Sequence, residues 1–185
     1  MPTKPEIRRC ELVAETRIFR VERLHLRFSN GREVEFERLR GSGRGAVLVL
    51  PLRQDDMLLL IREYAAGVER YELAFPKGLM ERGESPQAAA DREIKEEVGY
   101  GARELTVLRT LSVAPGYADF QTHVVLARDL YPEQLPGDEP EPVEVVPWPA
   151  QQLDELLRQE DFLEARSIAA LFLFQRLREE GRLHD

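Results

Sequence analysis

The stretch from Ser85 to Gly99, SPQAAADREIKEEVG, carries the start and stop signals of one helix and so limits what the chain can fold into. Ser85 is a good N-cap, Pro86 suits the first helical position, and Gly99 is a good C-terminal stop. These signals predict a helix from about Pro86 to Val98, with an apolar residue at every fourth position from Ala90. Such a helix buries one face only and must pack against the apolar face of another element.

The same helix gathers Glu93, Glu96 and Glu97 beside its apolar stripe. Like charges one turn apart repel each other, and of the neighbouring basic residues Arg92 can pair with Glu96 whereas Lys95 points elsewhere. A hard divalent cation such as Mg²⁺ binds carboxylate oxygens and often shares its shell with a substrate phosphate. From the helix alone, a solvated acidic patch and a cation site both stay open.

Short apolar runs around this helix predict strands, so the chain is expected to be α+β. The runs are AVLVLPL, MLLLIREYAA, YELAFPKG (a strand ending at Pro76), LTVLRTLSV, HVVLARDL and EVVPWP. The segments AQQLDELLRQ and EARSIAALFLFQRLREE predict two further helices, and YPEQLPGDEPEPVE predicts an acidic, proline-rich loop.

Residues 7–40 predict an N-terminal antiparallel β-hairpin. Leu24, Leu26 and Phe28 alternate with polar residues, and Asn30-Gly31 is a strong hairpin turn signal. The glycine-rich segment 41–45 lacks the ending of a phosphate-binding P-loop and predicts a hinge or turn. A lone hairpin is marginal in water, so its apolar face needs cover from the rest of the chain or from a second chain. We therefore divide the chain into an extension, residues 1–44, and a main domain, residues 45–185.

Composition excludes several classes of function. The formal net charge of −8 argues against a non-specific grip on extended nucleic acid or on an anionic membrane. The single cysteine and three scattered histidines argue against a disulfide and against a zinc site of Cys/His type. No apolar run reaches the length of a membrane helix, and the N-terminus lacks the apolar core of a signal peptide. A cytoplasmic location is the prediction.

The spacing of the glutamates resembles a known motif. The stretch from Gly78 to Tyr100 fits the pattern G-x5-E-x7-R-E-U-x-E-E-x-G-U, in which U is aliphatic. The matching residues are Gly78, Glu84, Arg92, Glu93, Ile94, Glu96, Glu97 and Gly99. A chance match of this kind has a probability on the order of 10⁻⁷ at average residue frequencies. The pattern is the Nudix box, and the chain resembles a Nudix hydrolase; Tyr100 departs from the pattern at a position that packs rather than reacts.

The resemblance implies a fold and a set of roles. The expected fold is an α/β/α sandwich around a mixed sheet, and the expected cofactor is Mg²⁺, with Mn²⁺ as the alternative. Glu93 and Glu97 are the implied metal ligands, with Glu96 near the metal and the backbone carbonyl of Lys77 completing the shell. The implied supporting residues of the box are Gly78, Glu84, Arg92 and Gly99.

Beyond the box, the hairpin, LIREYAAG, YELAFPKG, APGY and DLYPEQLPGDEPEP resemble the ADP compounds hydrolases, which stand near the ADP-ribose pyrophosphatases. The implied substrates are ADP-ribose, NADH and diadenosine oligophosphates, with AMP as one product. Pro115 indicates an ADP-ribose type enzyme, and Tyr117 is associated with diadenosine substrates. The resemblance also implies a homodimer that uses the N-terminal segment. The alternatives are a Nudix hydrolase of nucleotide sugars or RNA caps, and a non-catalytic nucleotide-binding module.

Further site residues are predicted outside the box. Arg62 is the first candidate for clamping phosphates, since a guanidinium fork matches them, and Arg38 and Arg44 come next. Glu72 is a candidate for the base or ribose pocket. A metal-bound carboxylate is a poor proton acceptor, so a separate general base is useful. The resemblance places that base in the acidic loop at Glu139, with Glu141 second, and Glu96 is a further catalytic candidate.

Overall fold

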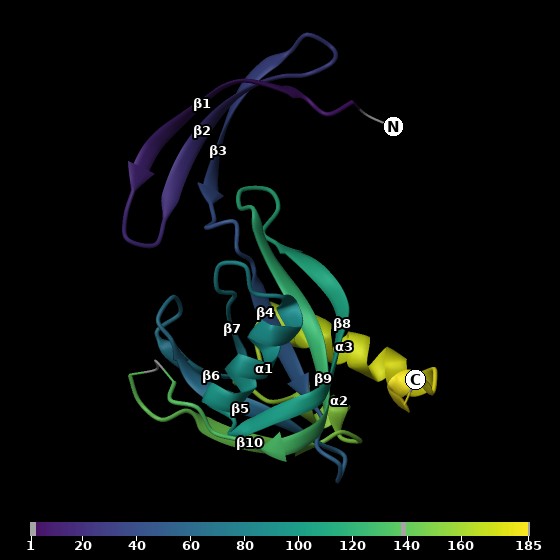
Figure 1. Ribbon diagram of the computed structural model, residues 1–185. Helices are drawn as coiled ribbons and strands as arrows, with labels where there is room; N and C mark the ends of the chain where they lie inside the picture. Colours follow the sequence, from purple (N-terminus) through teal and green to yellow (C-terminus); the bar gives the residue numbers. More distant parts are fainter. Residues whose placement is uncertain (1–2, 138–139, 185) are drawn as a thin grey trace. The chain divides into compact units, whose positions relative to one another are not determined.

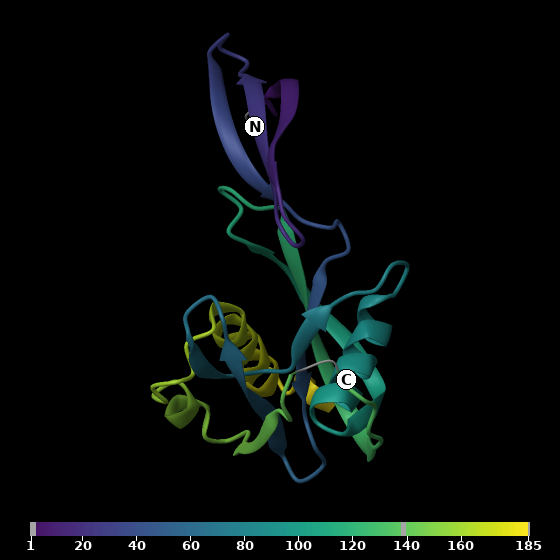
Figure 2. The same cartoon turned by 90° about the vertical axis from the view of Figure 1, so that its left-hand side faces the viewer.

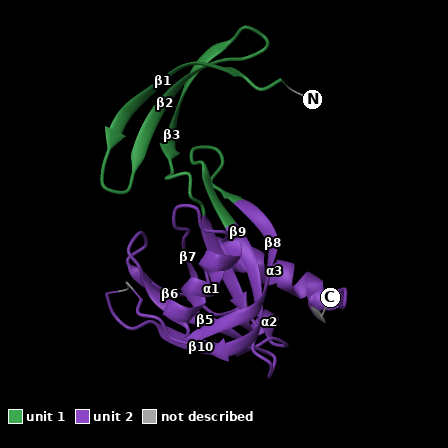
Figure 3. Ribbon diagram, in the orientation of Figure 1, with its two compact units in different colours: residues 1–45, 112–122 green, residues 46–111, 123–185 purple. Residues whose placement is uncertain are grey.

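The computed structural model describes residues 3–137 and 140–184 (Figure 1). The strands are β1 (Glu6–Glu15), β2 (Arg20–Arg27), β3 (Glu33–Arg40), β4 (Ala46–Pro51), β5 (Met57–Ala65), β6 (Arg70–Ala74), β7 (Lys77–Leu79), β8 (Tyr100–Val113), β9 (Phe120–Pro132) and β10 (Glu144–Pro149). The helices are α1 (Pro86–Glu97), α2 (Leu153–Leu156), α3 (Ala165–Glu179) and the short 3₁₀ helix η1 (Arg182–His184). The chain forms two compact units, one of residues 1–45 and 112–122 and one of residues 46–111 and 123–185 (Figure 3).

The N-terminal unit is built on a three-stranded antiparallel sheet in the order β1-β2-β3. The predicted turn is present: Gly31 has φ 81°, and the Phe28 N–H donates to the Arg32 carbonyl over 2.9 Å. The predicted hairpin is formed by β2 and β3, and β1 adds a third strand along β2. Nearly all of β1 is exposed, so its sequence lacks the alternation of buried and polar residues by which a strand is recognised.

The segment 112–122 joins this unit because Leu39 bridges Ala118, and the Leu39 N–H donates to the Tyr117 carbonyl over 2.7 Å. Pro115 and Tyr117 therefore belong to the same unit as residues 1–45, whereas the sequence had assigned them to the main domain. Contacts between distant segments decided this grouping.

The larger unit has two sheets, a three-stranded one in the order β10-β5-β6 and a mixed four-stranded one in the order β7-β4-β9-β8. Figure 2 shows α3 on one side of these strands and α1 on the other. The α+β class and the helix–sheet–helix layering predicted above are confirmed.

Alternate residues of the central strands pack into two separate cores. Leu48 and Leu50 of β4 pack in the core that contains α2 and α3. Val47 and Val49 of the same strand pack in the core that contains α1. Burial on both faces explains why AVLVLP reads as a continuous apolar run rather than as an alternating one.

Two elements differ in extent between the sequence prediction and the structure. YELAFPKG forms two strands in different sheets, β6 and β7, separated at Pro76, whose carbonyl accepts from the Val49 N–H over 2.8 Å. The segment AQQLDELLRQ forms only the short helix α2, and its N-cap Gln152 makes no side-chain capping bond. Within residues 3–137 and 140–184, no helix is long and apolar enough to cross a membrane.

Candidate active site

The loop from β7 to α1 is closed by its own side chains. The Ser85 hydroxyl caps α1 by accepting from the Ala88 N–H over 3.2 Å, as its sequence position predicts. Gly83 turns the chain with φ 84°, a conformation that favours glycine. The Glu81 N–H donates to a Glu84 carboxylate oxygen over 2.7 Å, so the Glu84 side chain stabilises the conformation of its own loop.

Arg92 connects the carboxylates of this region. Its Nε donates to Glu84 over 3.1 Å, and its Nη1 donates to Glu93 over 2.8 Å and to Glu96 over 3.0 Å. Its Nη2 also donates to the Leu79 carbonyl over 3.0 Å. Glu84 first, and then Glu93, raise the pKa of Arg92, so the guanidinium stays charged and holds the side chains in fixed orientations.

The ionisation of Glu84 follows from the same contacts. Burial opposes its charged form, but the hydrogen bonds from Arg92 and from the Glu81 N–H outweigh burial and lower the pKa of Glu84. Glu84 is thus a charged hydrogen-bond partner of Arg92.

Two backbone positions of β7 restrict where the side chains of Glu93 and Glu97 can lie. The carboxylate of Glu93 lies against Gly78, where a Cβ atom would lie 2.1 Å from Glu93 Cδ. Only glycine leaves room for that carboxylate. The Lys77 N–H donates to Glu97 Oε2 over 3.1 Å. The metal-ligand candidates on α1 therefore converge on the backbone of Lys77 and Gly78.

Lys95, on the same helix, serves a different group of carboxylates. Its ammonium pairs with Asp91 over 2.8 Å and with Glu133 over 2.7 Å. These partners, Asp91 first, raise the pKa of Lys95. The only lysine of α1 is thus bound to acids outside the glutamate cluster, and the cation of α1 that pairs with the cluster is Arg92.

A hollow of about 540 Å³ opens beside the glutamates. Its lining consists of Glu93, Glu96, Glu97 and Val98 from the α1 region, and of Gln134, Leu135, Pro136, Gly137, Pro140, Glu141, Pro142, Val143 and Val145 from the loop and β10. The loop rests on the end of α1, because the Leu135 N–H donates to the Lys95 carbonyl over 3.1 Å and Gln134 Nε2 donates to the Glu96 carbonyl over 3.0 Å. The volume lies within the usual range for small-molecule sites. Glu141 borders this hollow, and Glu139 lies outside the described residues.

The donor set suits a hard divalent cation. Glu93, Glu96 and Glu97 offer carboxylate oxygens, the ligand type that Mg²⁺ prefers, and Gly78 leaves the space against Glu93 open to the carboxylate. Among the described residues, no group of three or more His, Cys, Asp or Glu side chains is arranged to hold a metal ion. Arg92 donates to Glu93 and Glu96, and the Lys77 N–H donates to Glu97.

The predicted substrate-binding residues already have polar partners: the arginines pair with carboxylates or a hydroxyl, and Glu72 pairs with an arginine. Arg62 pairs with Glu144 over 2.7 Å and with Asp161 over 2.9 Å, and these partners raise its pKa. The buried Glu72 pairs with Arg70 over 2.6 Å.

Arg38 and Arg44 belong to the other compact unit. Arg38 donates to Glu22 over 2.7 Å, and Arg44 Nε donates to the Ser42 hydroxyl over 3.3 Å.

The sequence did not single out Glu63, which forms an ion pair with the Lys77 ammonium. Strand alternation could have found it, because Glu63 shares a face of β5 with Leu59 and Ile61, which pack in the α1 core. It also lies directly opposite Glu72 on β6. The Lys77 and Arg70 cations offset the repulsion between these two glutamates.

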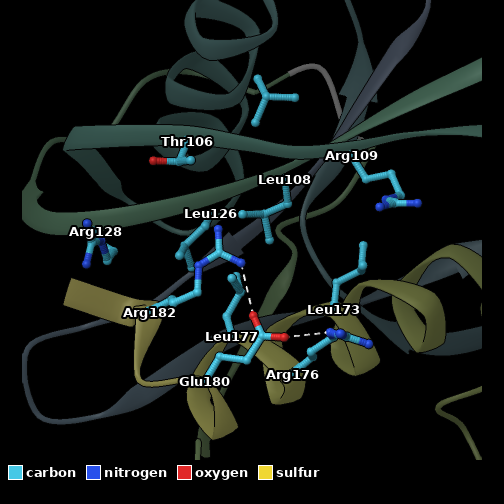
Figure 4. Close-up of a pocket in the computed structure, with 11 residues that line it drawn as sticks. Thr106, Leu108, Arg109, Leu126, Arg128, Leu173, Arg176, Leu177, Glu180 and Arg182 are labelled. Carbon is cyan, nitrogen blue, oxygen red and sulfur yellow. Dashed lines mark hydrogen bonds and ion pairs between the residues drawn. The ribbon is translucent and has the colours of Figure 1, made fainter. Parts of the chain in front are cut away.

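A second hollow, of about 370 Å³, lies between β8 and α3 and contains none of the predicted site residues (Figure 4). Arg109, Arg128, Arg176 and Arg182 surround a floor of leucines there. Glu180 pairs with Arg176 over 2.8 Å and with Arg182 over 3.0 Å. The carboxylate of Glu180, which lines this hollow, is paired with two arginines, whereas the hollow beside α1 is lined by three glutamates of the box and is the candidate active site.

Family models, known relatives and a solved structure all match the chain to the same family of proteins. Residues 43–172 match the NUDIX domain, and residues 5–38 match the NudE-type Nudix hydrolase N-terminal domain. The chain is 51% identical to ADP compounds hydrolase NudE of Escherichia coli, with 97% of each chain covered. It is 32% identical to an ADP-ribose pyrophosphatase of Bacillus subtilis, over 71% of this chain and 72% of the relative. A crystal structure of an ADP compounds hydrolase superposes with a TM-score of 0.92 at 50% identity, over 99% of both chains.

Proposed function

The chain belongs to the Nudix hydrolases, enzymes that cleave pyrophosphate bonds, and on that premise we propose that its substrates are ADP-linked compounds such as ADP-ribose, NADH and diadenosine oligophosphates. AMP is then one product, and the second product is the other phosphorylated half. The similarity to an ADP compounds hydrolase over nearly the whole chain supports this substrate class.

The observation that carries the proposal is the convergence of the box glutamates on Lys77 and Gly78 beside an open hollow. Glu93 and Glu97 are the proposed main ligands of Mg²⁺, or of Mn²⁺ as the alternative, with Glu96 and the Lys77 carbonyl completing the set. When bound, the cation offsets phosphate charge and makes a coordinated water acidic. Arg92 orients Glu93 and Glu96, and the Lys77 N–H orients Glu97.

The proposed general base lies in the loop that precedes β10. Glu139 is the first choice and Glu141 the second, with Glu96 as the remaining candidate. The position of Glu141 supports the choice of this loop, because Glu141 borders the hollow that the box glutamates line. A carboxylate outside the metal shell keeps the basicity that a ligand loses.

Arg62, Arg38, Arg44 and Glu72 remain proposed substrate-binding residues. The arginines now pair with carboxylates or a hydroxyl, so binding a pyrophosphate requires an exchange of partners. Phosphate is a suitable replacement, since it accepts the same charge-assisted hydrogen bonds as a carboxylate.

A homodimer formed through the N-terminal extension, residues 1–44, is the proposed assembly. The extension leaves many large apolar side chains exposed, among them Ile7, Leu12, Val13, Ile18, Phe19, Phe28 and Phe36. Association with a second chain would remove part of this apolar surface from water. A cytoplasmic location and the absence of extended nucleic acid as a partner stay predictions from the sequence.

The decisive experiment is a product assay in ¹⁸O-labelled water with ADP-ribose, NADH, diadenosine triphosphate, GDP-mannose and capped RNA, with and without Mg²⁺. We expect AMP from the adenine compounds only, and labelled oxygen identifies the phosphorus attacked. Turnover of GDP-mannose or capped RNA alone would assign the enzyme to those substrates. Binding without turnover would identify a nucleotide-binding module.

A further inference from the structure

Two tyrosines form an exposed pair on the β5–β6 hairpin. Tyr64 and Tyr71 lie directly opposite each other, with ring centroids 5.5 Å apart and planes at 64°. Tyr64 is 53% exposed and Tyr71 is 50% exposed, although aromatic side chains usually gain most by burial. Both rings therefore keep apolar surface available to a ligand.

The side chain of Glu141 connects this pair to the candidate active site. The Tyr71 hydroxyl donates to Glu141, and Glu141 lines the hollow beside the box glutamates. The hydrogen bond to Glu141 raises the pKa of Tyr71, so the hydroxyl stays a donor at neutral pH. The β5–β6 hairpin is thereby tied to the loop that carries the proposed base.

A cross-strand aromatic pair also stabilises a hairpin, and this explains part of the arrangement. Hairpin stabilisation does not require the hydroxyl of Tyr71 to reach a loop residue 70 positions away in sequence. Exposed rings beside the candidate active site match the stacking surfaces on which proteins hold bases, because every base presents a π-face.

We propose that Tyr64 and Tyr71 form a stacking platform for the second base of a two-base substrate, the nicotinamide of NADH or the second adenine of a diadenosine compound. This inference rests on the proposed function and refines its substrate class. ADP-ribose carries no second base and gains nothing from the platform. The tyrosine pair then determines how well the enzyme uses two-base substrates relative to ADP-ribose.

The test compares Tyr64→Leu, Tyr71→Leu and Tyr71→Phe with wild type. Phe172→Leu is the matched control, because Phe172 is 54% exposed and lies on α3. We expect both tyrosine-to-leucine variants to lose about tenfold in kcat/KM for NADH and diadenosine triphosphate, mostly through KM. For ADP-ribose the change in Tyr64→Leu should stay within about twofold, whereas Tyr71→Leu also removes the hydrogen bond to Glu141, and Tyr71→Phe measures that loss separately. Tyr71→Phe keeps the ring, so it should retain most of the preference for two-base substrates.

A binding measurement separates this inference from the proposed function. NADH is titrated in EDTA and followed by nicotinamide fluorescence, with ADP-ribose as competitor, so that no turnover is needed. A tenfold weaker Kd for NADH in Tyr64→Leu, with the ADP-ribose Kd unchanged, supports the platform even if turnover of both compounds is absent. Equal losses for all substrates, no loss for any, or the same loss in Phe172→Leu would overturn it. Melting temperatures near that of wild type show that the hairpin is intact.

Discussion

Replacement of Gly78 by alanine tests whether the position of Glu93 depends on the missing side chain. The new Cβ would lie 2.1 Å from Glu93 Cδ, whereas ordinary contact begins near 3.4 Å, so the carboxylate has to move by about 1.3 Å. Gly78 lies outside the left-handed region, so alanine fits its backbone without strain. The atoms that clash belong to the end of a flexible side chain, so Glu93 should rotate away while the fold is kept.

The expected loss is large for activity and small for stability. A misplacement of about 1 Å in a catalytic group costs about 100-fold, so we expect kcat/KM for ADP-ribose to fall by about that factor. Loss of the Glu93–Arg92 contact should cost about 1 kcal/mol, or about 2–4 °C in Tm. Because Glu93 is a proposed ligand, the Mg²⁺ concentration for half-maximal rate should also rise.

The assay is steady-state AMP release over a Mg²⁺ titration, with Tm from calorimetry and Mn²⁺ binding from electron paramagnetic resonance. Gly67→Ala is the matched control, because a Cβ atom there meets nothing within 4 Å and its φ is not left-handed. It should keep wild-type kinetics. Wild-type kcat/KM and metal affinity in Gly78→Ala would refute the reasoning.

The other expectations concern separate parts of the molecule. Glu97→Gln should lower turnover by orders of magnitude with little change in Tm, and near-normal turnover would contradict its role as a ligand. Glu139→Gln should lower kcat strongly while Mn²⁺ still binds; a loss confined to Glu141→Gln would move the base to Glu141, and full activity in both would exclude the loop. Sedimentation at micromolar protein should give about twice 21.3 kDa, and a monomer would exclude the dimer. Ser167→Ala should lower Tm by several degrees, because it leaves the buried N–H of Phe75, now 3.1 Å from the Ser167 hydroxyl, without its acceptor.

The sequence by itself determined the helix of the candidate site. Predicted from Pro86 to Val98, α1 runs from Pro86 to Glu97, with Ser85 as N-cap and Gly99 at φ 75° after its end. Capping and i,i+4 spacing act within one or two turns, so nearby residues suffice to predict them. For the same reason the Arg92–Glu96 pair was predictable, and it is present at 3.0 Å.

The tertiary structure decided which distant segments meet. The third strand of the N-terminal sheet, the separation of β6 from β7 and the grouping of residues 112–122 with the extension follow from strand pairing. So do the approach of Glu93 to Gly78 and the bond from Tyr71 to Glu141. The paired residues of β1 and β2 are 5 to 21 positions apart, and the other contacts join residues 15 to about 80 positions apart. No local pattern encodes them, because the order and register of the strands are fixed only when all strands pack into one structure.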